Sequence, residues 1–185
     1  YDLIEYLYTN AETMGADLDG IDQQTPSFFV WAVRDTFTAP LQRVQIIKGY
    51  VDENGDPQEQ VFDVACSDGG LPDSETYRCP DNNAKVDISN CVFSQDVGAA
   101  ELKTFWSDPT FEVKQRAFYD VKALENPTCR WSTWDAISRG FKPREDLHDT
   151  IQERAWSSPI WYIPPASDVD VVPLGGTVRM INLST

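Results

Sequence analysis

Apolar residues along this chain recur mostly with the spacing of β-strands. Residues 27–35 are apolar on both faces, as in a strand that is covered on two sides. Residues 116–125 alternate instead, and their apolar face comprises Ala117, Tyr119, Val121 and Ala123. Residues 158–163 form a further short strand that ends before two prolines. Short strands separated by turn signals predict a mainly β, sandwich-like module with a few short helices and extended terminal arms.

A β-hairpin is the clearest local signal. Two apolar runs, residues 42–51 and 59–66, flank an acidic turn that contains Asn54 and Gly55. An Asn-Gly pair readily takes up the left-handed conformation that tight hairpin turns require. The acidic turn also resembles a calcium-binding loop, but an EF-hand loop lies between helices, whereas the flanks here are strands. We therefore predict a hairpin at this position.

Three segments have the pattern of short helices. Residues 2–13 place apolar side chains at helical spacing, and residues 99–106 have the composition of a short helix. Ser132 opens a capping-box pattern, and Gly140 is expected to end the helix that follows.

The turn-forming residues suggest how the chain is divided. Residues 67–98 are rich in Ser, Asp, Asn, Gly and Pro, which predicts a long loop that is held by a disulfide. We expect an N-terminal helix and linker over residues 1–26, a β-rich accessory domain over residues 27–165, and an extended C-terminal arm over residues 166–185.

The balance of charges excludes several classes of partner. The 185 residues include 15 Lys and Arg against 30 Asp and Glu, a formal net charge of −15 at pH 7. Such a field repels phosphate backbones and anionic lipid surfaces, so we expect no nucleic-acid partner.

No apolar run approaches the ~20 residues of a membrane-spanning helix, so we expect no transmembrane segment. Because the chain opens at Tyr1 instead of an initiator Met, we interpret it as a processed or truncated piece.

The four cysteines predict two disulfides. Cys66, Cys79, Cys91 and Cys129 lack the C-x-x-C spacing of zinc and redox sites. An even number of such cysteines favours disulfides and an oxidising compartment, the periplasm or the cell exterior, and buried free thiols are the alternative. In a sandwich, Cys66 would end a strand beside the end of the strand that leads to Cys129. We therefore predict the pairs Cys66–Cys129 and Cys79–Cys91.

Residues that could carry catalysis are few. His148 is the only histidine, and its neighbours are the acids Glu145, Asp146 and Asp149. A zinc or iron site usually takes two or more imidazoles or thiolates, and no G-x-S-x-G elbow is present to expose a serine nucleophile. We expect neither a catalytic residue nor a bound metal or cofactor in this chain.

Several segments occur in the order known from one protein family. They are residues 14–18 (MGADL), 29–32 (FVWA), 45–49 (QIIKG), 62–65 (FDVA), 98–102 (GAAEL), 117–119 (AFY), 130–136 (RWSTWDA) and 151–162 (IQERAWSSPIWY). Over roughly residues 14–164 the chain resembles the C-terminal part of the bacterial domain-of-unknown-function family 3604. So many ordered segments make the resemblance specific.

The resemblance implies a larger parent protein. The family is similar to the polymerase-and-histidinol-phosphatase superfamily of metallohydrolases, whose metal ligands lie in an N-terminal barrel-like region. This chain would then be the C-terminal β-rich accessory module of an exported, phosphoesterase-like hydrolase. Divalent metal is expected only in the N-terminal catalytic domain, which would be the partner of this chain. The alternative is a noncatalytic binding or structural subunit of a bacterial envelope or extracellular assembly.

Residues 129–162 concentrate aromatic and basic side chains. They hold Trp131, Trp134, Trp156, Trp161, Arg130, Arg139, Arg144 and Arg154. Arginine pairs through its planar fork with carboxylates or with an anionic substrate. We expect this segment, with Arg130, Trp131 and Arg154 at its centre, to face the catalytic domain or to rim its substrate site. The alternative is that the rings pack within the sandwich, as we expect of Trp31 and Trp161.

Overall fold

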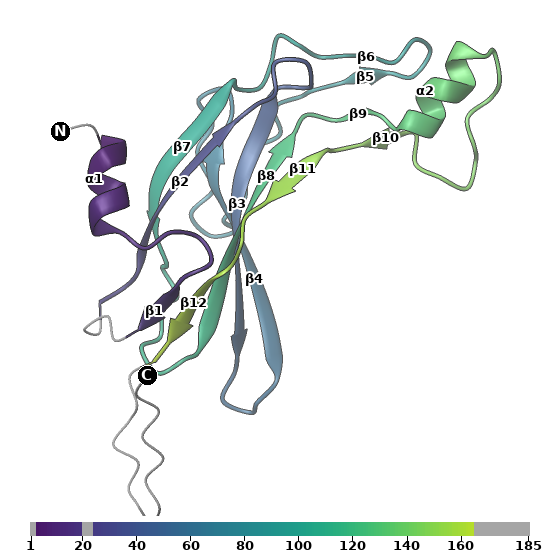
Figure 1. The fold of residues 1–185 in the computed structure, drawn as a ribbon. Coiled ribbons are helices and arrows are strands. Elements are labelled where there is room, and N and C mark those ends of the chain that lie inside the picture. The colour runs from purple at the N-terminus through teal and green to yellow at the C-terminus, as the bar shows by residue number, and fades with distance from the viewer. Residues whose placement is uncertain (1–2, 20–23, 165–185) are drawn as a thin grey trace, which may run out of the picture.

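A six-stranded sheet forms the body of the molecule (Figure 1). The computed structural model describes residues 3–19 and 24–164. The sheet has the order β1-β12-β8-β3-β4, and β11 also pairs with β8. Its strands are β1 (Asp17–Asp19), β3 (Leu41–Val51), β4 (Pro57–Cys66), β8 (Ala117–Glu125), β11 (Arg154–Trp156) and β12 (Ile160–Ile163). The other elements are α1 (Leu3–Asn10), β2 (Ser27–Val33), β5 (Val86–Asp87), β6 (Val92–Phe93), β7 (Glu101–Ser107), β9 (Thr128–Cys129), α2 (Trp131–Ser138) and β10 (Thr150–Ile151).

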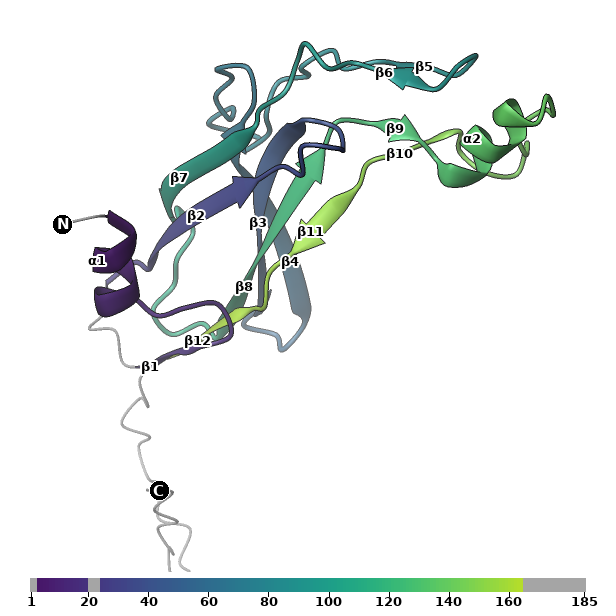
Figure 2. The same ribbon diagram turned by 45° about the horizontal axis from the view of Figure 1, so that its top comes forward.

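A two-stranded sheet of β2 and β7 covers one face of the six-stranded sheet (Figures 1 and 2). Aromatic side chains join the two layers, because the Phe28 and Tyr119 ring centroids are 4.7 Å apart and those of Phe62 and Trp106 are 5.0 Å apart. The fully buried core comprises Phe28, Val30, Leu41, Val44, Ile46, Phe62, Val64, Leu102, Ala117, Tyr119 and Tyr162. The expected mainly β, sandwich-like fold is confirmed.

The β3–β4 hairpin forms where the sequence predicts it. Gly55 has a φ of +86°, a conformation that glycine adopts without steric cost. One carboxylate oxygen of Asp52 accepts the backbone N–H groups of Asn54 and Asp56, both at 2.9 Å. These backbone hydrogen bonds, the one from Asp56 first, hold the pKa of Asp52 below its usual value.

The prediction of a helix over residues 99–106 is wrong, because residues 101–107 form strand β7. Leu102 is buried and Trp106 packs against the core, whereas Lys103 and Phe105 are exposed, so the apolar period is two residues. Pairing with β2 over seven residues satisfies the backbone of β7. The helix-favouring residues at its start were therefore outweighed by long-range strand pairing.

The helix expected after residue 131 is present, but its start differs from the prediction. Helix α2 begins at Trp131 with Arg130 as the N-cap residue, and no side chain caps it. Ser132 therefore lies inside the first turn, and the expected capping box is absent. Gly140 ends the helix as expected, with a φ of +73° and a backbone hydrogen bond to Ile137.

The N-terminal segment takes part in the main sheet. Helix α1 confirms the expected first helix, but residues 17–19, expected to be linker, form β1 and pair in parallel with β12. The division at residues 26 and 165 stays a prediction, and the arm over residues 166–185 lies outside the described residues. Within the described residues, neither helix is long and apolar enough to cross a membrane.

One ion pair is buried between the β7–β8 connection and β3. Lys48 Nζ lies 2.7 Å from Asp108 Oδ2, and the two side chains are 2% and 0% exposed. Lys48 also donates to the carbonyl of Thr110 at 2.8 Å, and the Tyr119 hydroxyl donates to Asp108 at 2.8 Å. Burial, followed by the charge of Asp108, raises the pKa of Tyr119 far above its usual value. These bonds hold the connection against the core.

Both disulfide pairings that the sequence suggested are wrong, although two disulfides do form. Cys66 bonds Cys79 and Cys91 bonds Cys129, with Cα atoms 5.6 and 5.5 Å apart. The prediction placed Cys66 beside the end of β8, but β3 lies between β4 and β8. Two strand spacings separate those ends, about 10 Å, which exceeds the Cα separation of about 7 Å that a disulfide spans.

Peptide mapping of the unreduced chain checks this correction. We expect digestion under non-reducing conditions to give the linked peptides Cys66–Cys79 and Cys91–Cys129, because only these partners lie within bonding distance. Mapping after reduction and reoxidation in denaturant serves as the control for scrambled pairing. A Cys66–Cys129 peptide from native protein would contradict the strand order described above.

Candidate functional site

An arm projects from the sheet between β8 and β11. The chain leaves β8 at Glu125, forms β9, α2 and β10, and returns to the sheet as β11 (Figure 1). Strands β9 and β10 pair antiparallel, and the Cys91–Cys129 disulfide joins the base of the arm to the β5–β6 hairpin. The hairpin extends in the same direction as the arm in both ribbon views (Figures 1 and 2). A covalent bond and a strand pair therefore hold the arm in place.

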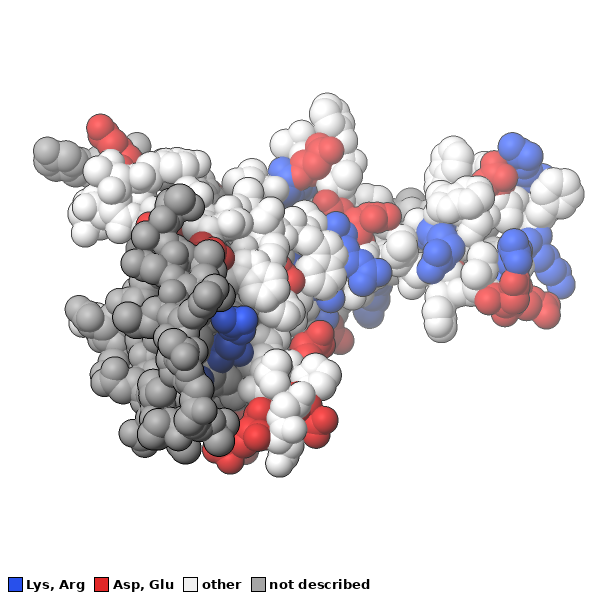
Figure 3. All heavy atoms as spheres, turned by 60° about the horizontal axis from the view of Figure 1, so that its bottom comes forward, with Lys and Arg blue, Asp and Glu red and all other residues white. Residues whose placement is uncertain are grey.

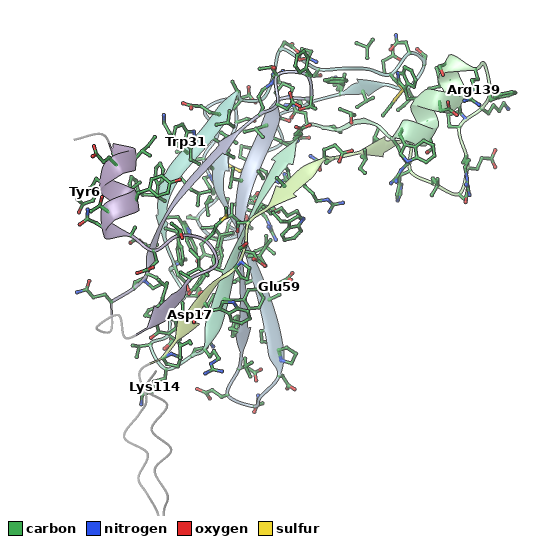
Figure 4. The ribbon with its side chains drawn as sticks, in the orientation of Figure 1. Tyr6, Asp17, Trp31, Glu59, Lys114 and Arg139 are labelled. Carbon is green, nitrogen blue, oxygen red and sulfur yellow. A yellow bond between two sulfur atoms is a disulfide. The ribbon has the colours of Figure 1, made fainter. Side chains whose placement is uncertain are left out.

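The arm presents large aromatic side chains to solvent. Trp131, Trp134 and Phe141 are 78%, 60% and 69% exposed. Thr133 is the buried residue of α2, so the helix is anchored by a small side chain and not by its rings. Figure 4 shows Arg139 of this arm far from the rest of the sandwich. We call this surface, defined by Trp131, Trp134 and Phe141, the aromatic arm surface.

A cavity of about 570 Å³ lies where the arm joins the sheet, and we call it the arm-base cavity. Its lining includes Lys122 from β8, Arg154 from β11, and Arg130 from the start of α2. The polar side chains of Gln42 and Gln152 complete the wall, and the amide of Gln152 donates to Gln42 at 2.9 Å. Residues far apart in sequence thus bring three cations to one hollow.

Among the described residues, the three cations of the arm-base cavity form no close ion pair. Within the described residues, none of Lys122, Arg130 and Arg154 lies within 4.0 Å of a carboxylate oxygen. Asp81 also lines the cavity, and one of its carboxylate oxygens accepts the backbone N–H of Asn83 at 2.9 Å. Figure 3 shows basic side chains gathered between the sheet and the arm, and on the arm itself. The cavity is therefore a positive region on an acidic chain.

The surroundings of Lys122 disfavour its charge. Burial lowers the pKa of Lys122, and the positive charges of Arg154 and Arg43 lower it further. The negative charges of Glu59 and Asp63 act in the opposite direction but do not outweigh these effects. The ammonium group also lies 5.1 Å from the ring centroid of Trp156, within the range of a cation–π contact. An anion in the cavity would offset the repulsion among these cations.

The structure brings together two of the three residues that the sequence placed at the centre of the candidate surface. Arg130 and Arg154 both line the arm-base cavity, and neither is buried in an ion pair within the described chain. Trp131, the residue after Arg130, does not line the cavity and is exposed on the aromatic arm surface. The expected interface role of these three residues stays a prediction.

Sequence reasoning missed Lys122 and identified the packing of the tryptophans only in part. Alternation in residues 116–125 already puts Lys122 on the face opposite Tyr119, but the pattern does not say which strands lie beside it. Trp31 and Trp161, expected to pack in the core or between elements, are 44% and 43% exposed and lie outside the core. Trp161 does pack against Phe118 of β8, with the ring centroids 5.3 Å apart. Trp106 is the tryptophan that packs on the core. Position in a strand did not show which face of that strand is covered.

The acidic segment around His148 forms no metal site in the described residues. The carbonyl oxygen of His148 accepts a hydrogen bond from Arg130 Nε at 3.1 Å, and Asp146 pairs with Arg144 at 2.6 Å. No three His, Cys, Asp or Glu side chains gather closely enough in the described part of the chain to hold a metal ion. That the chain binds neither metal nor cofactor stays a prediction.

Comparison with known proteins identifies a family. A family model described as "Protein of unknown function (DUF3604)" matches residues 1–164, a range that includes the sandwich, the arm and the arm-base cavity. No curated protein and no solved structure matches the chain. The resemblance seen in the sequence is confirmed at the level of the family. The chain belongs to the DUF3604 family, whose function is unknown.

Proposed function

We propose that this chain is the noncatalytic accessory module of an exported, metal-dependent hydrolase of the phosphoesterase type, and that its arm docks on the catalytic domain. The aromatic arm surface is the observation that carries the docking. Trp131, Trp134 and Phe141 project on one covalently anchored element, and each leaves most of its ring in water. Clustered exposed rings are characteristic of contact surfaces, because their burial on association is favourable.

The hydrolase part of the proposal rests on the similarity of the family to the polymerase-and-histidinol-phosphatase superfamily. In that superfamily the metal ligands lie upstream of the region that this chain resembles. The module then needs no metal ligands of its own. It would act by positioning the catalytic domain or its substrate.

The export part of the proposal rests on the cysteines. All four are in disulfides, and no free cysteine occurs in the described residues. Disulfides persist in the periplasm and outside the cell, whereas cytosolic thiols are kept reduced. We therefore assign the parent protein to the periplasm or to the secreted fraction.

Site-specific cross-linking tests the docking. We expect a photoreactive benzoylphenylalanine in place of Trp134, in the natural full-length polypeptide, to cross-link to the catalytic domain, because this ring would lie in the interface. The same amino acid at Lys114 is the matched control, since Lys114 is exposed at the opposite end of the sheet (Figure 4). Peptide sequencing by mass spectrometry identifies the cross-linked segment.

The outcomes distinguish the proposed function from its alternative. A cross-link to a His-rich segment of the same polypeptide, with divalent metal bound to that polypeptide and not to the 185-residue chain, supports the hydrolase module. A cross-link to a different protein supports a binding or structural subunit of an envelope assembly instead. Equal labelling from positions 134 and 114 would show that the aromatic arm surface is not a docking surface.

A further inference from the structure

The arm-base cavity gathers positive charge in a chain that has twice as many acids as bases. Some exposed cations elsewhere take carboxylate partners, as in the pairs Lys103–Glu101, Arg139–Asp135 and Arg144–Asp146. Lys122, Arg130 and Arg154 instead lack such a partner within the described residues. Lys85, Lys114 and Arg116 also lack a carboxylate partner within the described residues, but they do not line the cavity. The three cations of the arm-base cavity are distinguished by lining one hollow together.

Strand register forces two of these cations together. Arg154 of β11 lies opposite Leu124 of β8, and Trp156 lies opposite Lys122. Residues opposite each other share a face of the sheet, and so do residues two apart in one strand, so Arg154 and Lys122 are diagonal neighbours on one face. Diagonal neighbours are within reach of long side chains. The positive charge of Arg154 accordingly lowers the pKa of Lys122, and an anion bound between them would reduce this repulsion.

Two of the residues around the cavity, Arg130 and Gln152, are held by hydrogen bonds before any ligand arrives. The guanidinium of Arg130 donates from Nε to the carbonyl of His148, and its backbone N–H donates to the carbonyl of Asp149 at 2.9 Å. The amide of Gln152 donates to the carbonyl of Glu125 at 3.0 Å as well as to Gln42. Such prior ordering reduces the entropy that binding would otherwise cost.

We infer that the arm-base cavity binds a small organic molecule through a phosphate or sulfate ester group, with Lys122, Arg130 and Arg154 as the ligands of that group. A guanidinium group can donate two parallel hydrogen bonds to two oxygens of a tetrahedral anion, and an ammonium group adds a point charge. The arm-base cavity, about 570 Å³ and open to solvent on one side, has room for a small organic ligand. The amides of Gln42 and Gln152 would face the uncharged part of the molecule.

This site is built by the described residues of one chain and does not depend on the proposed docking of the arm. The aromatic arm surface and the arm-base cavity have no residue in common. Loss of anion binding would therefore leave the cross-linking result unchanged, and the two proposals fail separately.

Calorimetric titration at constant ionic strength tests the site. The probes are glucose 6-phosphate, glucose 6-sulfate and inorganic phosphate, each added to the 185-residue chain. We expect saturable binding of at least one ester, and Arg154→Gln to weaken it about tenfold or more, because bidentate charge-assisted hydrogen bonds are lost. Arg116→Gln is the matched control, since it removes the same charge near the other end of β8.

Each outcome bears on the inference. Tighter binding of the phosphate ester or of the sulfate ester identifies the anion, and an unchanged affinity in the Arg116→Gln variant shows that the effect is local. Absence of saturable binding by all three probes would overturn the inference. So would equal weakening by Arg154→Gln and Arg116→Gln, because that result would report only net charge. Unchanged thermal unfolding of each variant confirms that the fold is retained.

Discussion

Lys48→Met is expected to lower the free energy of unfolding by about 3–5 kcal/mol. The substitution removes the ammonium group that lies 2.7 Å from Asp108 and leaves a carboxylate, 0% exposed, without its counter-charge. The Tyr119 hydroxyl still donates to that carboxylate, but a hydrogen bond does not replace a charge in a water-poor interior. Denaturant unfolding followed by tryptophan fluorescence measures the loss.

Two further variants isolate the buried pair as the cause. Lys103→Met removes a lysine that is more than half exposed in its pair with Glu101, and we expect a change below about 1 kcal/mol. Combining Lys48→Met with Asp108→Asn should cost less than the two single changes added together, because the double variant buries no unpaired charge. A loss from Lys48→Met as small as that from Lys103→Met would contradict the buried network.

Gly98→Ala is expected to lower the free energy of unfolding by about 2–4 kcal/mol, from backbone strain and overpacking together. Gly98 has a φ of +99°, a backbone conformation that residues other than glycine rarely adopt. An added Cβ would lie 2.5 Å from Pro40 Cβ and 2.8 Å from the amide nitrogen of Asn126. Asn126 is 0% exposed and donates to the carbonyl of Val97, so it has little room to move.

Gly55→Ala is the control that separates strain from overpacking. Gly55 also has a positive φ, +86°, but an added Cβ would meet nothing within 4 Å. We expect this variant to lose about 1 kcal/mol from strain alone. Equal losses at the two glycines in thermal or denaturant unfolding would show that the backbone around Gly98 is not tightly packed.

The two predictions with the largest effects concern the positions that hold long loops against the sandwich. The Lys48–Asp108 pair fixes the β7–β8 connection, and Gly98 closes the long loop between β4 and β7 against Pro40 and Asn126. Gly98 also donates its backbone N–H to both carboxylate oxygens of Asp68 at 2.9 Å. The loops that lack regular structure are therefore ordered by buried polar groups as well as by disulfides.

Four of the five longest strands, β2, β3, β4 and β8, could be predicted from the sequence, because their signals are local. Alternation in residues 116–125 and the Asn54-Gly55 turn each depend on residues within one segment, and the structure confirms both. Residues 99–106 show where local reasoning fails. Their composition favours a helix, but pairing with β2 and burial of Leu102 make them a strand. Tertiary contacts outweigh intrinsic preference in short segments.

The candidate site, too, could be predicted from the sequence only in part. The sequence by itself determined that Arg130 and Arg154 lie in a segment rich in basic and aromatic residues, that the four cysteines form disulfides, and to which family the chain belongs. Only the tertiary structure decided that Lys122 joins the two arginines and that Cys66 bonds Cys79. Both depend on which strands are neighbours, and strand order is a long-range property that no local pattern of residues encodes.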